Sequence, residues 1–415
     1  MQRKYFVRLI PLLIFIIIWI IVIVLYLLNP YHYPTLNFHS WFIVVSALLS
    51  VITGYLIVHI FLHEDNLIPV KYFEKRYSVT FERTIVYYEL FLLFITILGI
   101  YLYLHAIAGN IGGLQNYVLR PIYVRVKLIE LRAQAFTGWN LSLSLSSYLI
   151  SFIYAANLFG GVVYTFQTKS RYIGLIPLPI NLIYSIAMVG RYALVNTTAI
   201  WFFAFWFTIY FYDSKRYEKL TLRLRKLIVF LSLFVIAFIV WLLIIRSVIE
   251  GSATDYVVKY IYAYLSGPLA AFHKFTQSNF SFSYGVETFH SIFKWLAKFG
   301  IIDKYYVGGP NLEWTMVGGI ALNTYTFVYS FYKDFGIFGL TIVAALWGGL
   351  SRMALHWLEQ SYSFTRLFIV SIFTFSLFMS FYAFYLKIFT TLVFYLIITL
   401  IADLIMRRKR LYYIN

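Results

Sequence analysis

The chain has 415 residues, of which 62% are hydrophobic and only 12% are charged, and its mean hydropathy is +0.79. A soluble domain cannot bury that much apolar surface, so the composition excludes the soluble globular classes and indicates an all-α polytopic membrane protein. The chain contains no cysteine, which excludes disulfides, thiolate nucleophiles and cysteine-based metal sites.

The formal charge of +18 does not indicate a nucleic-acid partner. Most of the 34 lysines and arginines lie beside apolar runs, often in short connecting segments. Such a placement is typical of the positive-inside rule, in which basic loops stay in the cytoplasm. We therefore expect membrane lipids as neighbours and no nucleic acid.

Ten membrane spans are predicted from apolar runs of about 20 residues, the length that a helix needs to cross a bilayer. The first run is too long for a signal-peptide core and lacks a small-residue cleavage site, so we interpret it as a retained span. The predicted spans are 6–28, 40–62, 84–107, 141–166, 173–190, 194–212, 227–249, 335–355, 366–384 and 387–405.

A cytoplasmic N-terminus places most of the basic connecting segments inside, as the rule requires. Ten spans then return the C-terminus to the cytoplasm, which agrees with the basic tail Arg407-Arg408-Lys409-Arg410. Three parts follow: a seven-span bundle, 1–249, with a basic outer loop, 108–140; a large outer loop, 250–334, before the eighth span; and the last three spans with the tail, 335–415.

An amphipathic helix is predicted within the large outer loop, from Glu287 to Phe299. Apolar residues recur there at helical spacing, polar residues lie on the opposite face, and Gly300 follows as a stop. Such a helix can lie on the bilayer surface or cover a pocket, although it can equally pack against the helical bundle.

Basic residues on the outer side are the first candidates for a binding site. Arg191 lies at a tight outer hairpin between two spans, where a guanidinium can bind a phosphate through two hydrogen bonds. A lone arginine at a span end is also typical of a snorkelling anchor. The outer loop and the seventh span add Arg120, Arg125, Arg132 and Arg246, which suit either an anionic lipid-linked ligand or lipid headgroups.

Outer carboxylates and histidines are candidates for a general base towards a sugar hydroxyl. We take Asp334, Glu287 and His290 as catalytic candidates, although most such groups are solvated loop charges and His273 is more typical of a structural histidine. No outer His-x-x-x-His, Asp-x-Asp or Glu-x-x-His pattern occurs. The sequence therefore favours a reaction without a metal or cofactor, in which arginines neutralise the leaving group.

The large outer loop is rich in tyrosine, including Tyr264 and Tyr325. Tyrosine favours the membrane interface, which explains most of these residues. Aromatic faces with hydroxyl edges also suit sugar rings, so a glycan groove is compatible with the pattern.

Three stretches of the chain together resemble the bacterial oligosaccharide repeat unit polymerases, the O-antigen and capsule polymerase family. They lie at the span hairpin, early in the large loop and at the end of that loop. They read Gly190-Arg191-Tyr-Ala-Leu194, then Tyr262-Ala-Tyr264-Leu-Ser-Gly267-Pro268 with Phe272, then Asn323-Thr-Tyr325-Thr-Phe327 through Asp334-Phe-Gly336-Ile-Phe-Gly339.

The resemblance implies a GT-C-type membrane glycosyltransferase in the bacterial plasma membrane. It would join undecaprenyl-pyrophosphate-linked repeat units, both as donor and as acceptor, in the biosynthesis of lipopolysaccharide or capsule, alongside a flippase and a chain-length regulator. The family relies on outer-face arginines, which correspond to Arg191 and to Arg120, Arg125 and Arg132. Asn323, Tyr325 and Tyr264 would then contact the glycan.

Two alternatives remain open. The related O-antigen ligases carry a histidine directly before the asparagine of the third stretch, whereas this chain has Leu322 there. A transporter of lipid-linked sugars would need charged groups deep within spans and usually repeat-related halves. The clear charges inside the predicted spans, Glu89 and Asp403, lie near cytoplasmic ends, and no repeat is visible.

Overall fold

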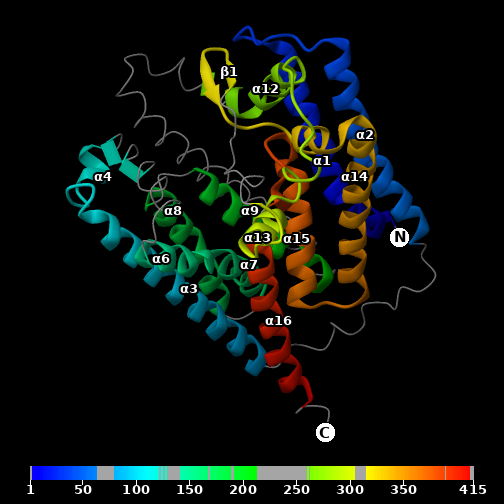
Figure 1. The fold of residues 1–415 in the computed structure, drawn as a ribbon. Coiled ribbons are helices and arrows are strands. Elements are labelled where there is room, and N and C mark those ends of the chain that lie inside the picture. The colour runs from blue at the N-terminus through cyan, green and yellow to red at the C-terminus, as the bar shows by residue number, and fades with distance from the viewer. Residues whose placement is uncertain are drawn as a thin grey trace. The chain divides into compact units, whose positions relative to one another are not determined.

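A computed structural model describes most of the chain, and Figure 1 shows its fold. The described residues are 2–62, 79–120, 123–124, 127–128, 141–166, 169–187, 191–212, 259–260, 262–303, 315–387 and 389–411. Within them, seven helices are long and apolar enough to cross a membrane, which confirms an all-α multi-pass membrane protein. These stretches are Arg8–Leu28, Phe38–Phe61, Phe81–Ala108, Leu145–Tyr164, Leu194–Phe211, Phe327–Gln360 and Phe364–Phe381.

Two of the predicted spans differ from these helices, and a third, 227–249, lies outside the described residues. The span expected at 173–190 is replaced by a 3-10 turn, η3 (Lys169–Leu175), and by the 11-residue helix α8 (Pro177–Ala187). At 1.5 Å per residue, α8 covers only about 16 Å of a core that is about 30 Å thick. The last helix, α16 (Phe389–Leu411), has a shorter apolar stretch, Leu392–Met406.

The chain folds into two compact units that do not follow the order of the sequence. Unit 1 combines Met1–Ile68, Ile228–Ser361 and Ile372–Val393. Unit 2 combines Pro69–Leu227, Tyr362–Ser371 and Phe394–Asn415.

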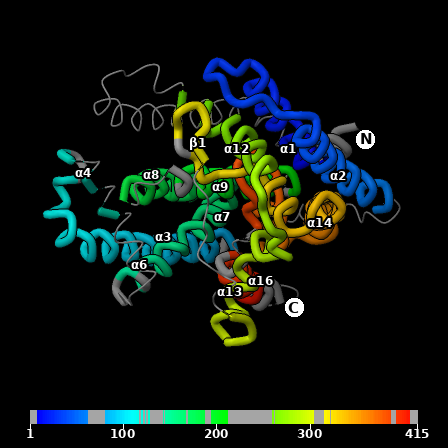
Figure 2. The backbone as a smooth tube through the Cα atoms, turned by 45° about the horizontal axis from the view of Figure 1, so that its top comes forward, coloured from blue at the N-terminus to red at the C-terminus, as the bar shows by residue number. Residues whose placement is uncertain are grey.

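Unit 1 is built on the close packing of α2 (Phe38–Phe61) along α14 (Phe327–Gln360), and Figure 2 shows the two helices side by side. Glycines make the approach possible. A Cβ atom on Gly54 would lie 1.9 Å from the backbone oxygen of Ala345, and one on Gly348 would lie 2.1 Å from that of Val51. Gly348 and Gly349 therefore allow α2 and α14 to pack closely.

Aromatic side chains fill the interior of unit 1 between α1 (Gln2–Leu28), α14 and the segment that follows α15 (Phe364–Phe378). Trp347 packs edge-on against Phe15 and Phe384. The Trp19 indole donates a hydrogen bond of 2.8 Å to the Ser380 hydroxyl. Edge-to-face aromatic contacts give a dense core, and the indole bond satisfies the one polar group that Trp19 buries.

The large loop predicted as helical also contains strands. Helix α12 (Gly267–Thr276) begins at the second motif, with Pro268 in its first turn. Beside it, β1 (Thr315–Val317) pairs antiparallel with β2 (Ile320–Leu322). The connecting residues Gly318 and Gly319 both have positive φ, as the tight two-residue turn of a hairpin requires.

The predicted amphipathic helix is observed as α13 (His290–Lys298). Its apolar side chains are not packed into the core, because Ile292 and Trp295 are both exposed, as are Phe289 and Phe299 at its two ends. This exposure favours the bilayer-surface interpretation over packing against the bundle.

Unit 2 contains α3 (Val79–Ala108), α4 (Asn116–Leu119), α6 (Leu141–Ser151), α7 (Ile153–Tyr164), η3, α8, α9 (Arg191–Tyr212) and most of α16. Buried polar pairs tie these helices together. The amides of Asn157 and Asn181 donate to each other at 2.8 Å. The Asp403 carboxylate accepts from the backbone N–H groups of Phe364 and Thr365 at 2.8 and 3.0 Å, so it caps the first turn of α15.

Candidate functional site at the N-terminal end of α14

Helix α14 is interrupted near its N-terminal end. Gly336 has φ 63° and ψ −165°, a conformation that is essentially confined to glycine. Gly336 therefore produces the break in α14. The Lys333 carbonyl accepts a hydrogen bond from the Ser283 N–H at 3.0 Å. The break therefore anchors the segment 283–289 of the large loop against α14.

Asp334 holds that segment in place. Its carboxylate accepts from the Ser283 hydroxyl at 2.5 Å, from the Glu287 N–H at 3.1 Å and from the Thr288 N–H at 2.6 Å. The side chain is only 1% exposed. Both oxygens are engaged and shielded from solvent, so the geometry favours a positioning role for Asp334 over the catalytic role that we predicted.

Glu287 and Lys333 form an ion pair on this anchored segment. The Lys333 Nζ lies 3.1 Å from Glu287 Oε1, and the side chains of Lys333 and Glu287 are 17% and 24% exposed, respectively. Lys333 also donates to the Tyr329 hydroxyl at 2.9 Å. The result is a partly exposed carboxylate and ammonium whose positions are set by the break in α14 and by Asp334.

Buried aromatic rings pack around Tyr329, the partner of Lys333. Tyr325 stacks on Tyr329 with ring centroids 4.3 Å apart, and Phe275 of α12 lies 4.6 Å from Tyr329. The Tyr325 hydroxyl is 2.6 Å from that of Thr315. Tyr325 is buried in this stack, so its ring stabilises the site and is not available as the sugar-stacking surface that we predicted.

A second polar group lies between α12 and α2. His273 Nδ1 is 2.9 Å from the Ser40 hydroxyl, which is also 2.7 Å from the Thr276 hydroxyl. Ser40 and His273 are both buried. Burial lowers the pKa of His273 below its usual value. The structure therefore agrees with the structural interpretation of this histidine.

The His273 environment predicts that the protein loses stability in acid. The pKa of the imidazole is lower in the folded protein than in the unfolded chain, so the unfolded chain binds more protons as the pH falls below about 6.5. We expect the unfolding temperature to be lower at pH 5 than at pH 7.5. In His273→Asn, which keeps a hydrogen-bonding side chain beside the Ser40 hydroxyl, this acid-induced decrease should be smaller. An equal decrease in both proteins would contradict the assignment.

The structure also describes the other predicted residues of unit 1. His290 begins α13 and is partly exposed. Asn323 follows β2 and is also partly exposed. Tyr264 contacts the rings of Tyr260 and Tyr382 at 6.2 and 6.4 Å. The catalytic role of His290 and the glycan contacts of Asn323 and Tyr264 stay predictions.

The predicted arginines belong to unit 2 or lie outside the described residues. Arg191 is the first residue of α9, and its side chain is not among those that the structure describes. Arg120 follows α4 and is exposed. Arg125, Arg132 and Arg246 lie outside the described residues, as do Glu130, Glu250, Asp255 and Glu313. A pyrophosphate role for these arginines stays a prediction.

The sequence did not point to Lys333 as a candidate site residue. Its signal was modest: it precedes Asp334 and follows Tyr329 by four residues, a spacing that places both side chains on one helical face. Among the described residues, no group of three histidines or carboxylates is arranged to hold a metal ion. The arrangement offers a carboxylate that can accept a proton and an ammonium that can stabilise developing negative charge.

Comparison of the chain with protein-family models, with curated proteins and with solved structures found no match.

Proposed function

We propose that this protein is a membrane glycosyltransferase that polymerises undecaprenyl-pyrophosphate-linked oligosaccharide repeat units on the outer face of the bacterial plasma membrane. Ten spans of GT-C type and cytoplasmic termini belong to the same proposal. The observation that carries it is the Glu287–Lys333 pair, a partly exposed carboxylate and ammonium held on a fixed segment beside a membrane-length helix.

The chemistry needs one proton acceptor and one stabilised leaving group. The hydroxyl of the incoming unit loses its proton to the Glu287 carboxylate as its oxygen bonds to the anomeric carbon of the growing chain. The bond between that carbon and the pyrophosphate breaks, and its electron pair leaves with the lipid pyrophosphate. Lys333 stabilises the negative charge on the departing oxygen. A pyrophosphate-binding role for Arg191 stays a separate prediction.

The test uses the purified protein in nanodiscs with lipid-linked repeat units, and products are separated on a gel. We expect a ladder of multiples. Glu287→Gln should slow its formation about 100-fold or more, the usual contribution of a general base. Lys333→Met should shorten or abolish the ladder. Lys298→Met, which removes an exposed lysine of α13, is the matched control and should leave the ladder unchanged.

An unchanged ladder in Glu287→Gln would show that this site does not take part in the reaction. The protein would still be a polymerase. Transfer of the unit to a lipid A core acceptor, with no ladder, would instead establish a ligase. If Arg191→Ala leaves the polymer length unchanged, Arg191 is excluded as a pyrophosphate ligand, and the proposed roles of Glu287 and Lys333 are not affected.

One observation favours the transporter alternative. Glu89 of α3 is completely buried, and neither carboxylate oxygen has a hydrogen-bond partner in the described part of the chain. Carboxyl groups inside spans often mark ion or proton pathways. Movement of the lipid-linked unit across a sealed vesicle membrane, abolished by Glu89→Gln and with no ladder, would establish a transporter.

A further inference from the structure

A groove runs along the surface of unit 2 between α3 and α16, and we call it the α3–α16 groove. Its volume is about 590 Å³, and its walls are formed by Tyr87 and Phe91 of α3 and by Ile397 and Ile401 of α16, which are all exposed. Figure 1 shows that α3 begins beside the C-terminal half of α16, so the two helices run in opposite directions here. Ligand pockets commonly have volumes of about 300–1,000 Å³, so the groove is large enough for a ligand.

The groove has an apolar floor and one closed end. Leu92 is buried in the floor, where the Tyr88 hydroxyl donates to the Ile398 carbonyl at 3.0 Å. Phe152 and Phe394 meet edge to face, with ring centroids 4.9 Å apart, and close the end that lies away from the start of α3. Such a lining favours a hydrocarbon chain as the ligand.

The length of the groove matches one leaflet of a bilayer. Its lining extends from Thr84 to Leu92 on α3 and from Phe394 to Ile405 on α16. At 1.5 Å per helical residue, these segments are about 12 and 17 Å long. Half of a hydrocarbon core that is about 30 Å thick measures about 15 Å. The groove therefore fits an acyl chain that stays within one leaflet.

Both helices change from apolar to basic at the open end of the groove. The apolar stretch of α3 begins at Phe81, and Arg83 lies one turn before Tyr87 on the same side of the helix. The apolar stretch of α16 ends at Met406, and the helix continues through the basic residues 407–410. Because the two helices are antiparallel, these boundaries lie at the same end, where lipid headgroups begin in a bilayer.

The carboxylates of these helix segments point away from the groove. Helical spacing places Glu82 and Glu89 together on the side of α3 opposite Tyr87, and Glu89 is completely buried. The Asp403 carboxylate of α16 is bonded to backbone N–H groups at the start of α15. The charge that α3 and α16 contribute at the open end of the groove is therefore positive, which suits an anionic headgroup.

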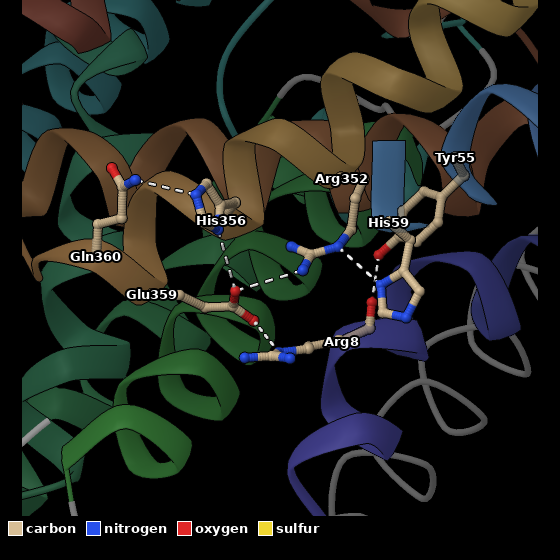
Figure 3. Close-up of polar contacts among 7 residues, drawn as sticks. All are labelled: Arg8, Tyr55, His59, Arg352, His356, Glu359 and Gln360. Atoms are coloured by element: carbon tan, nitrogen blue, oxygen red, sulfur yellow. Dashed lines mark hydrogen bonds and ion pairs between the residues drawn. The ribbon is translucent and has the colours of Figure 1, made fainter. Parts of the chain in front are cut away.

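Arg83 also differs from the buried arginines of unit 1. Figure 3 shows the guanidinium groups of Arg8 and Arg352 directed at the Glu359 carboxylate, from which they lie 3.1 and 3.4 Å away. These ion pairs join helices. In contrast, Arg83 is exposed and makes no hydrogen bond or ion pair in the described part of the chain. Its guanidinium can therefore reach the bilayer surface and bind a phosphate there.

We propose that the α3–α16 groove binds an anionic phospholipid. One acyl chain lies in the apolar hollow between Phe91 and Ile401, and Arg83 binds the phosphate with the help of the basic end of α16. A lipid that only solvates the protein needs neither a hollow of leaflet length nor a cation at its open end. The site is separate from the Glu287–Lys333 pair and does not depend on the proposed polymerase reaction.

Photocrosslinking of the full-length protein in phosphatidylcholine nanodiscs tests the proposal. The probe is phosphatidylglycerol or phosphatidylcholine with a diazirine on one acyl chain, and mass spectrometry locates the labelled peptides. One cation near a headgroup changes the affinity about fivefold, so we expect phosphatidylglycerol to label 84–92 and 394–405 at least about fivefold more than phosphatidylcholine. Arg83→Gln should reduce this preference about fivefold, and Arg83→Lys should keep it. Lys169→Gln, which removes an exposed lysine of η3, is the control.

A second variant tests the groove itself. Ile401→Trp places a bulky ring in the hollow and should reduce the labelling of both segments by phosphatidylglycerol. Leu400→Trp is the matched control, because Leu400 is equally exposed but does not line the groove. Equal labelling by the two lipid probes, or undiminished labelling in Ile401→Trp, would overturn the proposal. So would cross-links between the α16 segments of two copies in place of lipid labels, or displacement of the probe by equimolar undecaprenyl phosphate, since each identifies a different occupant.

Discussion

Gly348→Ala is expected to destabilise the protein by about 2–4 kcal/mol, although alanine ordinarily stabilises a helix interior by about 0.5–1 kcal/mol relative to glycine. The reason is the approach of α2. A Cβ on Gly348 would lie 2.1 Å from the Val51 carbonyl oxygen and 3.1 Å from the Tyr55 nitrogen. Both contacts are with backbone, so no side chain can rotate away, and the helices must separate.

Thermal unfolding of the purified protein in detergent, followed by tryptophan fluorescence, measures this effect. Gly109→Ala is the matched control, because nothing lies within 4 Å of a Cβ built on Gly109. The control should change stability by less than about 0.5 kcal/mol. Equal unfolding temperatures for the two variants would show that α2 and α14 do not approach each other this closely.

Asp334→Ala is expected to cost about 2–4 kcal/mol and to abolish the proposed activity. The substitution leaves the Ser283 hydroxyl and the N–H groups of Glu287 and Thr288 without their charged acceptor. The segment 283–289 then loses its anchor, and Glu287 no longer has a fixed position beside Lys333. Asp334→Asn keeps one acceptor oxygen and should lie between the wild type and the alanine variant.

Unfolding temperature and polymer ladder must both be measured, because a positioning residue affects both. Asp303→Ala removes an exposed loop carboxylate and serves as the control. A stable Asp334→Ala protein with an inactive site would instead restore Asp334 as a catalytic group. A stable and active variant would exclude both roles.

The sequence alone determined the membrane class, most of the spans and the amphipathic helix α13. These features depend on the order of apolar and polar residues within about 20 positions, which hydropathy and helical period report directly. The close-packing role of Gly348 and Gly349 was also accessible, because small residues at helix contacts are a local pattern. The hairpin β1–β2 was not predicted, because strands of three residues are too short to show a recognisable alternation of apolar and polar residues.

Only the tertiary structure decided which polar groups meet. Asp334 and Gly336 were visible as a motif, but nothing local indicated that the first would hold residues 283–288 or that the second would break α14. Arg8 and Glu359 are 351 positions apart in the chain, yet they form a buried ion pair. Such pairs are set by which helices pack together and at what depth, and that depends on the long-range fit of whole helix faces, which no local pattern encodes.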